Sequence, residues 1–309
     1  MSQYLMPRRA ALLGLLGCFA SGSGVTFAQQ RGDGGPPWMT RRVSGPGLVY
    51  RTFQSAAAGA PVSFHVYAPS QYEREPERRF PVIYWLHGSG PGLSGIPMLA
   101  RMFDRAIHEG KAPPMIVVFP NGRGVSMWCD ARDGSSPVET IVVRELVPFV
   151  DASMRTIPTL EGRIIEGFSM GGYGAARLGF TYPDLFGAVS MFGAGPLHPD
   201  FEVLPSNAAL RERVLESVYG GELDYFRALS PWRIAERNSP LLGGLPLRLA
   251  IGTRDATLPA NRDFHRHLSA LGIPNDYVEV PGVAHEPSAL IEGLGDQMWA
   301  FYRSVLGSI

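Results

Sequence analysis

One five-residue segment has the residue types and spacing of a nucleophile turn: Gly167-Phe168-Ser169-Met170-Gly171 fits the pattern G-x-S-x-G. In this pattern the serine lies in a sharp turn between a strand and a helix, and glycine two residues to either side leaves room for that turn. The flanks agree, since residues 163–166 predict a short apolar strand and residues 172–180 a helix of small residues. The chain holds 37 glycines, so the pattern alone also fits an ordinary strand-to-helix turn. The chemistry that it predicts is acyl transfer through Ser169.

A serine hydroxyl needs a histidine to take its proton and a carboxylate to orient that histidine. In the order found in α/β hydrolases, the acid ends a strand after the serine, and the histidine follows the next strand. The apolar run 247–252 leads into Asp255, and the run 277–280 is followed by a loop that carries His285. We therefore predict a catalytic triad of Ser169, His285 and Asp255.

Other acidic and histidine residues fit this order less well. Asp263, His265 and His267 lie inside a predicted helix, and His198 and Asp200 fall too early after the turn. His65 and His108 precede the turn, and Glu286 would have to bend back on its neighbour His285.

Backbone N–H groups must also stabilise the oxyanion of a tetrahedral intermediate. One donor usually follows the serine, and the other comes from the loop after an earlier strand. We predict the N–H of Met170 as the first donor. The second is the N–H of Gly88 or Ser89, because these residues follow the apolar run 80–86. The side chain of His87 is not needed for this role, and we expect it to be structural.

Strand and helix patterns alternate along most of the chain, which predicts an α/β fold with a mostly parallel twisted sheet and helices on both faces. The expected strands are 48–53, 62–67, 80–86, 115–119, 164–168, 188–192, 247–252 and 277–280, of which the first two form an antiparallel pair. The expected helices are 97–108, 138–154, 172–180, 207–219, 225–237, 259–271 and 288–306. Residues 196–244 interrupt the alternation as a helical insertion, which either roofs the site at the carboxyl ends of the strands or is a longer surface connection.

Composition excludes several classes of function. Lys plus Arg and Asp plus Glu both number 28, so the formal net charge is zero and a nucleic-acid partner is not expected. Only two cysteines are present, Cys18 and Cys129, without the clustered Cys/His spacing of a zinc site. The predicted chemistry needs no metal and no organic cofactor.

The first residues have the features of an export signal. Arg8-Arg9 precedes the apolar run 10–20, and small residues lead to Ala28, so we predict a signal peptide over residues 1–28. The alternatives are a retained anchor, twin-arginine export and a lipoprotein anchored through Cys18. We expect a disordered leader over residues 29–46 and one hydrolase domain over residues 47–309, with no membrane span after signal removal.

The motifs together resemble the esterase D-like family of α/β hydrolases, which includes S-formylglutathione hydrolases, feruloyl and acetylxylan esterases, siderophore esterases and mycolyltransferases. The matching segments are Leu86-His87-Gly88, Pro120-Asn121-Gly122, Trp128-Cys129-Asp130, residues 144–151, residues 167–172 and His285. The resemblance implies the same triad and the same oxyanion donor at Met170. It also suggests that Trp128 lines the substrate pocket. Trp232, in the aromatic insertion, is a second pocket candidate.

The sequence thus predicts a secreted serine carboxylic-ester hydrolase that forms an acyl-enzyme, acting on feruloyl or acetyl esters of polysaccharides. An acyltransferase of the mycolyltransferase type, a serine peptidase and a non-catalytic binding protein remain as alternatives. No glutathione-recognition signature is evident, and export does not suit the cytosolic branch of the family. The expected partner is a small-molecule or polysaccharide ester, and the sequence carries no signal for an oligomeric state.

Overall fold

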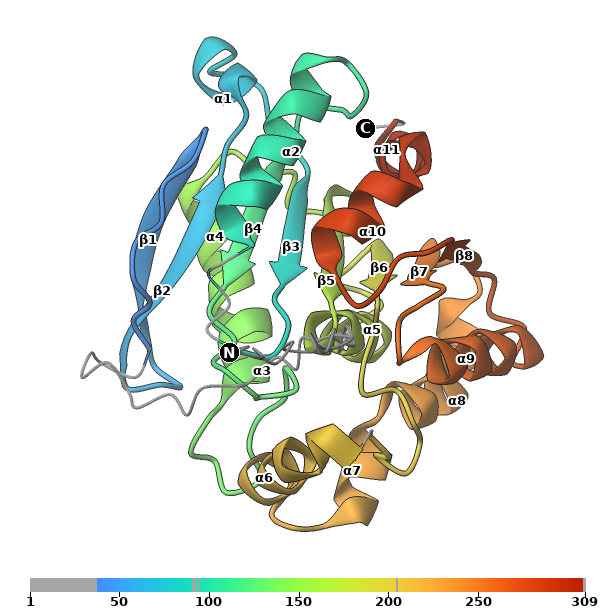
Figure 1. The fold of residues 1–309 in the computed structure, drawn as a ribbon. Coiled ribbons are helices and arrows are strands. Elements are labelled where there is room, and N and C mark those ends of the chain that lie inside the picture. Colours follow the sequence, from blue (N-terminus) through green and yellow to red (C-terminus); the bar gives the residue numbers. More distant parts are fainter. Residues whose placement is uncertain (1–37, 91–92, 94, 204, 308–309) are drawn as a thin grey trace, which may run out of the picture. The chain divides into compact units, whose positions relative to one another are not determined.

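The computed structural model describes residues 38–90, 93, 95–203 and 205–307. The described residues form an eight-stranded sheet with the order β1-β2-β4-β3-β5-β6-β7-β8 (Figure 1). The strands are β1 (Leu48–Ser55), β2 (Ala60–Tyr67), β3 (Val82–Leu86), β4 (Ile116–Pro120), β5 (Arg163–Phe168), β6 (Ala188–Phe192), β7 (Leu247–Gly252) and β8 (Asp276–Val280). β1 and β2 form the predicted antiparallel pair, β2 also runs antiparallel to β4, and the other neighbours are parallel. The predicted fold class is confirmed.

Helices cover both faces of the sheet, as the apolar runs of the central strands require. One face is covered by α2 (Ile96–His108), α10 (Pro287–Leu294) and α11 (Asp296–Leu306), which lie on the same side in Figure 1. The other is covered by α3 (Val138–Thr140), η1 (Ile141–Leu146), α4 (Val147–Ser153), α5 (Met170–Thr181), α8 (Pro231–Leu242) and α9 (Leu258–Ala270). Among the described helices, none is long and apolar enough to cross a bilayer.

Two predicted helices are divided in the structure. The helix predicted over residues 225–237 is α7 (Leu223–Leu229) followed by α8, because Ser230 has an extended backbone before Pro231 and caps the second helix. A residue before proline is disfavoured in the helical region, which explains the break. The helix predicted over residues 288–306 is divided into α10 and α11 at Gly295, whose φ is 54°.

The insertion between β6 and β7 is helical, as predicted. It contains η3 (Pro205–Asn207), α6 (Ala208–Tyr219), α7 and α8. Figure 1 shows α6 and α7 beyond the carboxyl ends of the parallel strands, the side of the sheet at which α/β proteins bind ligands. Two short elements, α1 (Ser70–Arg74) and η2 (Leu160–Gly162), complete the described structure.

The leader predicted over residues 29–46 lies partly within the described residues. Its described part is packed against the sheet: Trp38 is only 4% exposed, and its carbonyl accepts hydrogen bonds from the Ser63 N–H at 3.0 Å and the Asn121 amide at 2.9 Å. Thr40 N–H donates to Ser63 Oγ at 2.8 Å. The Gly and Pro content of this segment does not report that one large aromatic side chain is buried in it. Residues 1–37, which include the predicted signal peptide and Cys18, lie outside the described residues.

A buried ion pair connects the strand that leads to Ser169 with the rest of the core. Glu166 on β5 and Arg248 on β7 are 0% and 3% exposed, and their Oε2 and Nη2 atoms are 2.9 Å apart. Tyr302 on α11 donates to the other Glu166 oxygen at 2.6 Å, and Arg248 donates to the Met298 carbonyl at 2.9 Å. Both charges therefore have the partners that burial demands.

We expect Arg248→Met to lower the free energy of unfolding by about 3–5 kcal/mol, because the Glu166 carboxylate then stays buried without its cation. Urea unfolding followed by circular dichroism measures the change. The double variant Glu166→Gln/Arg248→Met is the matched control and should recover part of the loss, since it removes both charges. A loss below about 1 kcal/mol in the single variant would contradict this account of the ion pair.

Candidate active site

The turn at Ser169 has the strained geometry that the sequence pattern predicts. Ser169 has φ 59° and ψ −121°, a region that a residue with a side chain seldom adopts. A Cβ at Gly171 would lie 1.9 Å from the Leu86 carbonyl oxygen, and one at Gly167 would lie 2.5 Å from the backbone of Gly171. β6 fixes the turn from the other side, because the Ser169 N–H donates to the Phe192 carbonyl at 2.9 Å. Glycine is therefore required at both positions.

The three predicted triad residues are joined by hydrogen bonds. His285 Nε2 is 2.9 Å from Ser169 Oγ, and His285 Nδ1 is 2.7 Å from Asp255 Oδ2. Asp255 follows β7, and His285 lies in the loop between β8 and α10. The Asp255 side chain is 1% exposed and that of His285 38%, so the acid is buried and the histidine is open to solvent.

The environment of Asp255 keeps it ionised. Burial alone would raise the pKa of Asp255. The hydrogen bond and charge of His285, together with two hydrogen bonds from Thr257, outweigh this effect, so the pKa lies below the ordinary value. Thr257 donates its N–H to Asp255 Oδ1 at 2.8 Å and its hydroxyl at 2.9 Å. An ionised carboxylate only accepts, so His285 Nδ1 carries a proton and Nε2 is the acceptor for the Ser169 hydroxyl.

Two backbone segments, the start of α5 and the loop after β3, lie beside Ser169. Met170 is the first residue of α5, and the first N–H groups of a helix have no partner within the helix. The loop after β3 also approaches the serine: a Cβ at Gly88 would lie 3.2 Å from the Ser169 Cβ. Gly88 and Ser89 are both partly accessible. The arrangement matches the chemistry of a serine acyl-transfer site, in which an oxyanion forms between a helix N-terminus and a neighbouring loop.

Comparison with known proteins identifies the family. A family model described as Putative esterase matches residues 55–305. The chain belongs to this esterase family. An esterase of Mycobacterium tuberculosis is 31% identical over 304 aligned residues, a match that covers 90% of this chain and 65% of that relative. This family member therefore spans about 65% of the length of the curated relative. An endo-1,4-beta-xylanase/feruloyl esterase of Xylanibacter ruminicola is 28% identical over 161 residues, which cover 48% of this chain and 22% of that protein.

Solved structures support the fold of this family member. A ferulic acid esterase superposes with a TM-score of 0.70 at 23% identity, covering 84% of this chain and 98% of its own. An S-formylglutathione hydrolase from Agrobacterium tumefaciens superposes with a TM-score of 0.68 at 19% identity, covering 87% of this chain and 100% of its own. At these identities the likeness concerns the α/β-hydrolase fold alone.

Trp128 does not line an open pocket, contrary to the prediction. Its side chain is 0% exposed. The indole lies between two glycines, since a Cβ at Gly122 or Gly174 would come within 2.4 Å of it, and its N–H donates to the His87 carbonyl at 3.2 Å. Trp128 has a positive φ of 56°, and neither this conformation nor the burial of the side chain is visible in the sequence pattern.

The aromatic residues of the insertion are mostly packed together rather than open to a ligand. Tyr219 and Phe226 are 0% exposed, and Phe226 stacks on Phe201 with ring centroids 4.4 Å apart. Trp232 is partly buried, and its N–H donates to the Leu197 carbonyl at 2.6 Å. These contacts explain the aromatic content of the insertion as packing.

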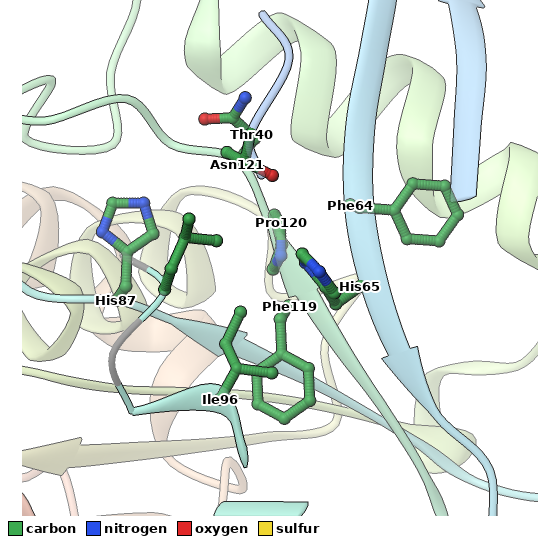
Figure 2. Close-up of a pocket in the computed structure, with 9 residues that line it drawn as sticks. Thr40, Phe64, His65, His87, Ile96, Phe119, Pro120 and Asn121 are labelled. Carbon is green, nitrogen blue, oxygen red and sulfur yellow. The ribbon is translucent and has the colours of Figure 1, made fainter. Parts of the chain in front are cut away.

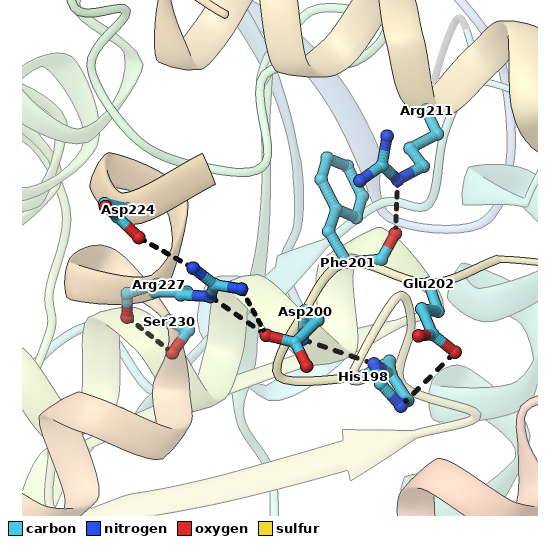
Figure 3. A network of polar contacts seen from close by, with 8 residues as sticks. All are labelled: His198, Asp200, Phe201, Glu202, Arg211, Asp224, Arg227 and Ser230. Carbon is cyan, nitrogen blue, oxygen red and sulfur yellow. Dashed lines mark hydrogen bonds and ion pairs between the residues drawn. The ribbon is translucent and has the colours of Figure 1, made fainter. Parts of the chain in front are cut away.

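Trp232 also borders a polar surface pocket whose other lining residues are Pro199, Asp200, Arg227, Ser230, Arg233 and Glu236. Figure 3 shows Arg227 between Asp200 and Asp224, to which it donates at 2.7 Å in each case. No triad residue lines this pocket. The structure therefore places Trp232 beside a pocket that is separate from the Ser169 hydroxyl.

A second small pocket lies beside the loop that follows β3, between β2, β4 and the segment before β1. Figure 2 shows His65 and His87 among its lining side chains, together with Thr40 and Asn121. His65 is 1% exposed, and its Nε2 accepts the Val43 N–H at 3.1 Å. Burial lowers the pKa of His65 and of His87, so both imidazoles favour the neutral form.

Because of these two histidines, we expect the free energy of unfolding to fall as the solution becomes acidic. Their pKa in the folded chain lies below the ordinary value of 6.5, so the unfolded chain takes up protons first as the pH falls. The stabilisation is complete above about pH 6.5 and declines toward the folded pKa, with a slope of up to about 1.4 kcal/mol per pH unit for each histidine. Urea unfolding between pH 8 and pH 5 should show a weaker decline in His65→Gln than in the unmodified chain. An equal decline of the free energy of unfolding in His65→Gln and in the unmodified chain would refute the assignment of the acid-induced loss to His65.

Sequence reasoning missed the partner that orients Asp255. Thr257 holds the acid in place, and the spacing Asp-x-Thr after a strand is the available signal, because an Asp side chain in a tight turn commonly accepts the backbone N–H two residues on. Phe168 was also unassigned; its ring centroid lies 4.7 Å from that of His285, so it packs against the imidazole. Phe168 thus contacts the histidine directly, whereas Thr257 acts on it through Asp255.

Proposed function

We propose that the chain is a serine carboxylic-ester hydrolase in which Ser169 is the nucleophile, His285 the general base and Asp255 the orienting acid. One observation carries the proposal: in a member of an esterase family, these side chains form an unbroken series of hydrogen bonds at a strained strand-to-helix turn. The series ends at the Ser169 hydroxyl, whose proton can pass to His285 Nε2. This arrangement activates a serine for attack on a carbonyl carbon.

In the acylation step, Ser169 Oγ bonds to the ester carbonyl carbon while His285 Nε2 takes the hydroxyl proton. The carbonyl π bond breaks, and the resulting oxyanion accepts hydrogen bonds from the Met170 N–H and from the N–H of Gly88 or Ser89. The C–O bond to the alcohol then breaks, and the imidazolium returns its proton to the leaving oxygen. The product is an ester between Ser169 and the acyl group.

Deacylation repeats these steps with water as the nucleophile. His285 Nε2 takes a proton from water, the hydroxide oxygen bonds to the acyl carbon, and Ser169 leaves with the proton from the imidazolium. The ionised Asp255 stabilises the imidazolium in both steps and does not itself become protonated.

We propose acetyl or feruloyl esters of polysaccharides as substrates, and export of the chain. Support for the substrate class comes from relatives whose names include feruloyl esterase, and support for export comes from the signal-like features of residues 1–28. Determining the N-terminal sequence of the exported protein tests cleavage after Ala28. A lipid-modified Cys18 would replace that assignment with membrane anchoring.

A substrate panel tests the function. Purified protein is assayed with p-nitrophenyl acetate, methyl ferulate and acetylated xylan, and products are quantified with and without an added alcohol acceptor. Release of free acid from at least one ester, lost in Ser169→Ala, supports the hydrolase. Transfer of most of the acyl group to the alcohol would instead favour an acyltransferase with the same triad. Absence of turnover with all three would refute the proposed substrate class.

A further inference from the structure

The loop that follows β4 is strained along its length. Three residues that are not glycine have a positive φ: Arg123 at 58°, Met127 at 54° and Trp128 at 56°. Such conformations are unfavourable for a residue with a side chain and persist only where surrounding contacts hold them. None of these residues belongs to the triad or supplies an oxyanion donor, so the strain needs another explanation.

Hydrogen bonds connect this strained loop to the oxyanion loop after β3. The Gly90 N–H donates to the Gly124 carbonyl at 2.8 Å, and the Gly122 N–H donates to His87 Nε2 at 3.2 Å. The indole N–H of Trp128 donates to the His87 carbonyl at 3.2 Å. The loop after β4 thereby holds His87 and Gly90, which lie on either side of the predicted donors at positions 88 and 89.

His87 links the two loops as a neutral imidazole. Because Nε2 accepts from the Gly122 N–H, Nδ1 carries the proton, and it lies 2.7 Å from the Gly88 carbonyl oxygen. Burial lowers the pKa of His87, which favours this neutral form. The Gly88 peptide is therefore held by the ring of the residue before it, and Figure 2 shows His87 with Asn121 on the wall of the same pocket.

Trp128 contacts both α5, which begins after Ser169, and His87 of the loop after β3. Its indole fills the space over Gly174 on α5, the helix that begins directly after Ser169, and the space over Gly122 in its own loop. The ring also meets the His87 imidazole edge to face, with centroids 4.9 Å apart. One rigid side chain thus spans the nucleophile helix and the oxyanion loop.

We propose that Trp128 is a positioning residue for the oxyanion loop, acting through its hydrogen bond to the His87 carbonyl. The bond fixes the peptide between His87 and Gly88, so that the Gly88 N–H stays directed at the carbonyl oxygen of the ester. The contact of His87 Nδ1 with the Gly88 carbonyl extends this restraint to the peptide that carries the Ser89 N–H. The inference rests on the proposed function, because an oxyanion must form beside Ser169. Removal of a whole oxyanion donor costs about 10²–10³ in kcat, so a displaced donor is expected to cost about 10- to 100-fold.

The test uses Trp128→Phe, which keeps an aromatic ring and removes the N–H. Trp299→Phe on α11 is the matched control, a partly buried tryptophan in the cluster on the other face of the sheet. We expect kcat on p-nitrophenyl acetate to fall about 10- to 100-fold in Trp128→Phe, with KM within about twofold. The affinity for an alkyl boronic acid, whose serine adduct mimics the tetrahedral intermediate, should fall in parallel. A merely structural role does not produce that correlation.

A second variant keeps the test decisive if Trp128→Phe fails to fold. Trp128 is replaced by 3-benzothienylalanine, which has nearly the shape of tryptophan and lacks the N–H donor. Either variant matching Trp299→Phe in kcat and in boronic acid affinity, while remaining folded by circular dichroism, would overturn the positioning role. If the unmodified chain hydrolyses no ester and binds no boronic acid, the proposed function fails instead.

Discussion

Ser169→Ala is expected to lower kcat on p-nitrophenyl acetate by about 10⁴-fold or more, to the level that binding and the oxyanion donors alone support. The substitution removes the oxygen that lies 2.9 Å from His285 Nε2, and no other hydroxyl takes its place in the hydrogen-bonded series. Initial rates at saturating substrate measure the effect. The fold should persist, because the turn is held by backbone hydrogen bonds and by the glycines at positions 167 and 171.

Ser269→Ala on α9 is the matched control, since Ser269 is exposed and its hydroxyl donates only to the His265 carbonyl, at 3.0 Å. The control should retain full turnover, and both variants should melt near the temperature of the unmodified chain. Turnover in Ser169→Ala within about tenfold of the unmodified chain would rule out Ser169 as nucleophile.

Asp255→Asn is expected to lower kcat by about 10⁴-fold while leaving the circular dichroism spectrum unchanged. Asparagine keeps an oxygen for the hydrogen bonds from Thr257, so the turn after β7 survives. Its amide N–H, however, would donate to His285 Nδ1 and leave the proton on Nε2. That nitrogen could then no longer accept the proton of Ser169.

The competing acid can be tested in the same assay. Glu286 neighbours His285 in sequence, but its carboxylate accepts the Ala289 N–H at 2.7 Å and caps α10. Glu286→Gln should therefore retain turnover within a fewfold, as should Asp263→Asn, a surface residue paired with Arg266. A steep loss in Glu286→Gln with normal turnover in Asp255→Asn would transfer the role of the acid to Glu286.

The parts of the site that sequence could predict are those set by local pattern. Ser169 is identifiable because only glycine fits two residues to either side of it, and that requirement is visible as G-x-S-x-G. Asp255 and His285 follow because parallel strands bring their carboxyl ends to one edge of the sheet, and both residues follow apolar runs. The roles proposed for these residues follow from their order along the chain.

The direction of a large side chain in a loop could not be predicted in this way. Trp128 turns into the core because its backbone has a positive φ and because Gly122 and Gly174 leave space for the indole, and these residues are far apart in sequence. The burial of Trp38 depends likewise on Asn121 and Ser63, which belong to other elements. The pairing of such residues is a property of the folded chain.

Covalent labelling tests the central claim most directly. The protein is treated with a fluorophosphonate, digested with protease, and the modified peptide is located by tandem mass spectrometry. The account predicts a single phosphonyl group on Ser169, no labelling of Ser169→Ala, and slower labelling of Asp255→Asn. An adduct on any other residue, or equal labelling of Ser169→Ala, would contradict it.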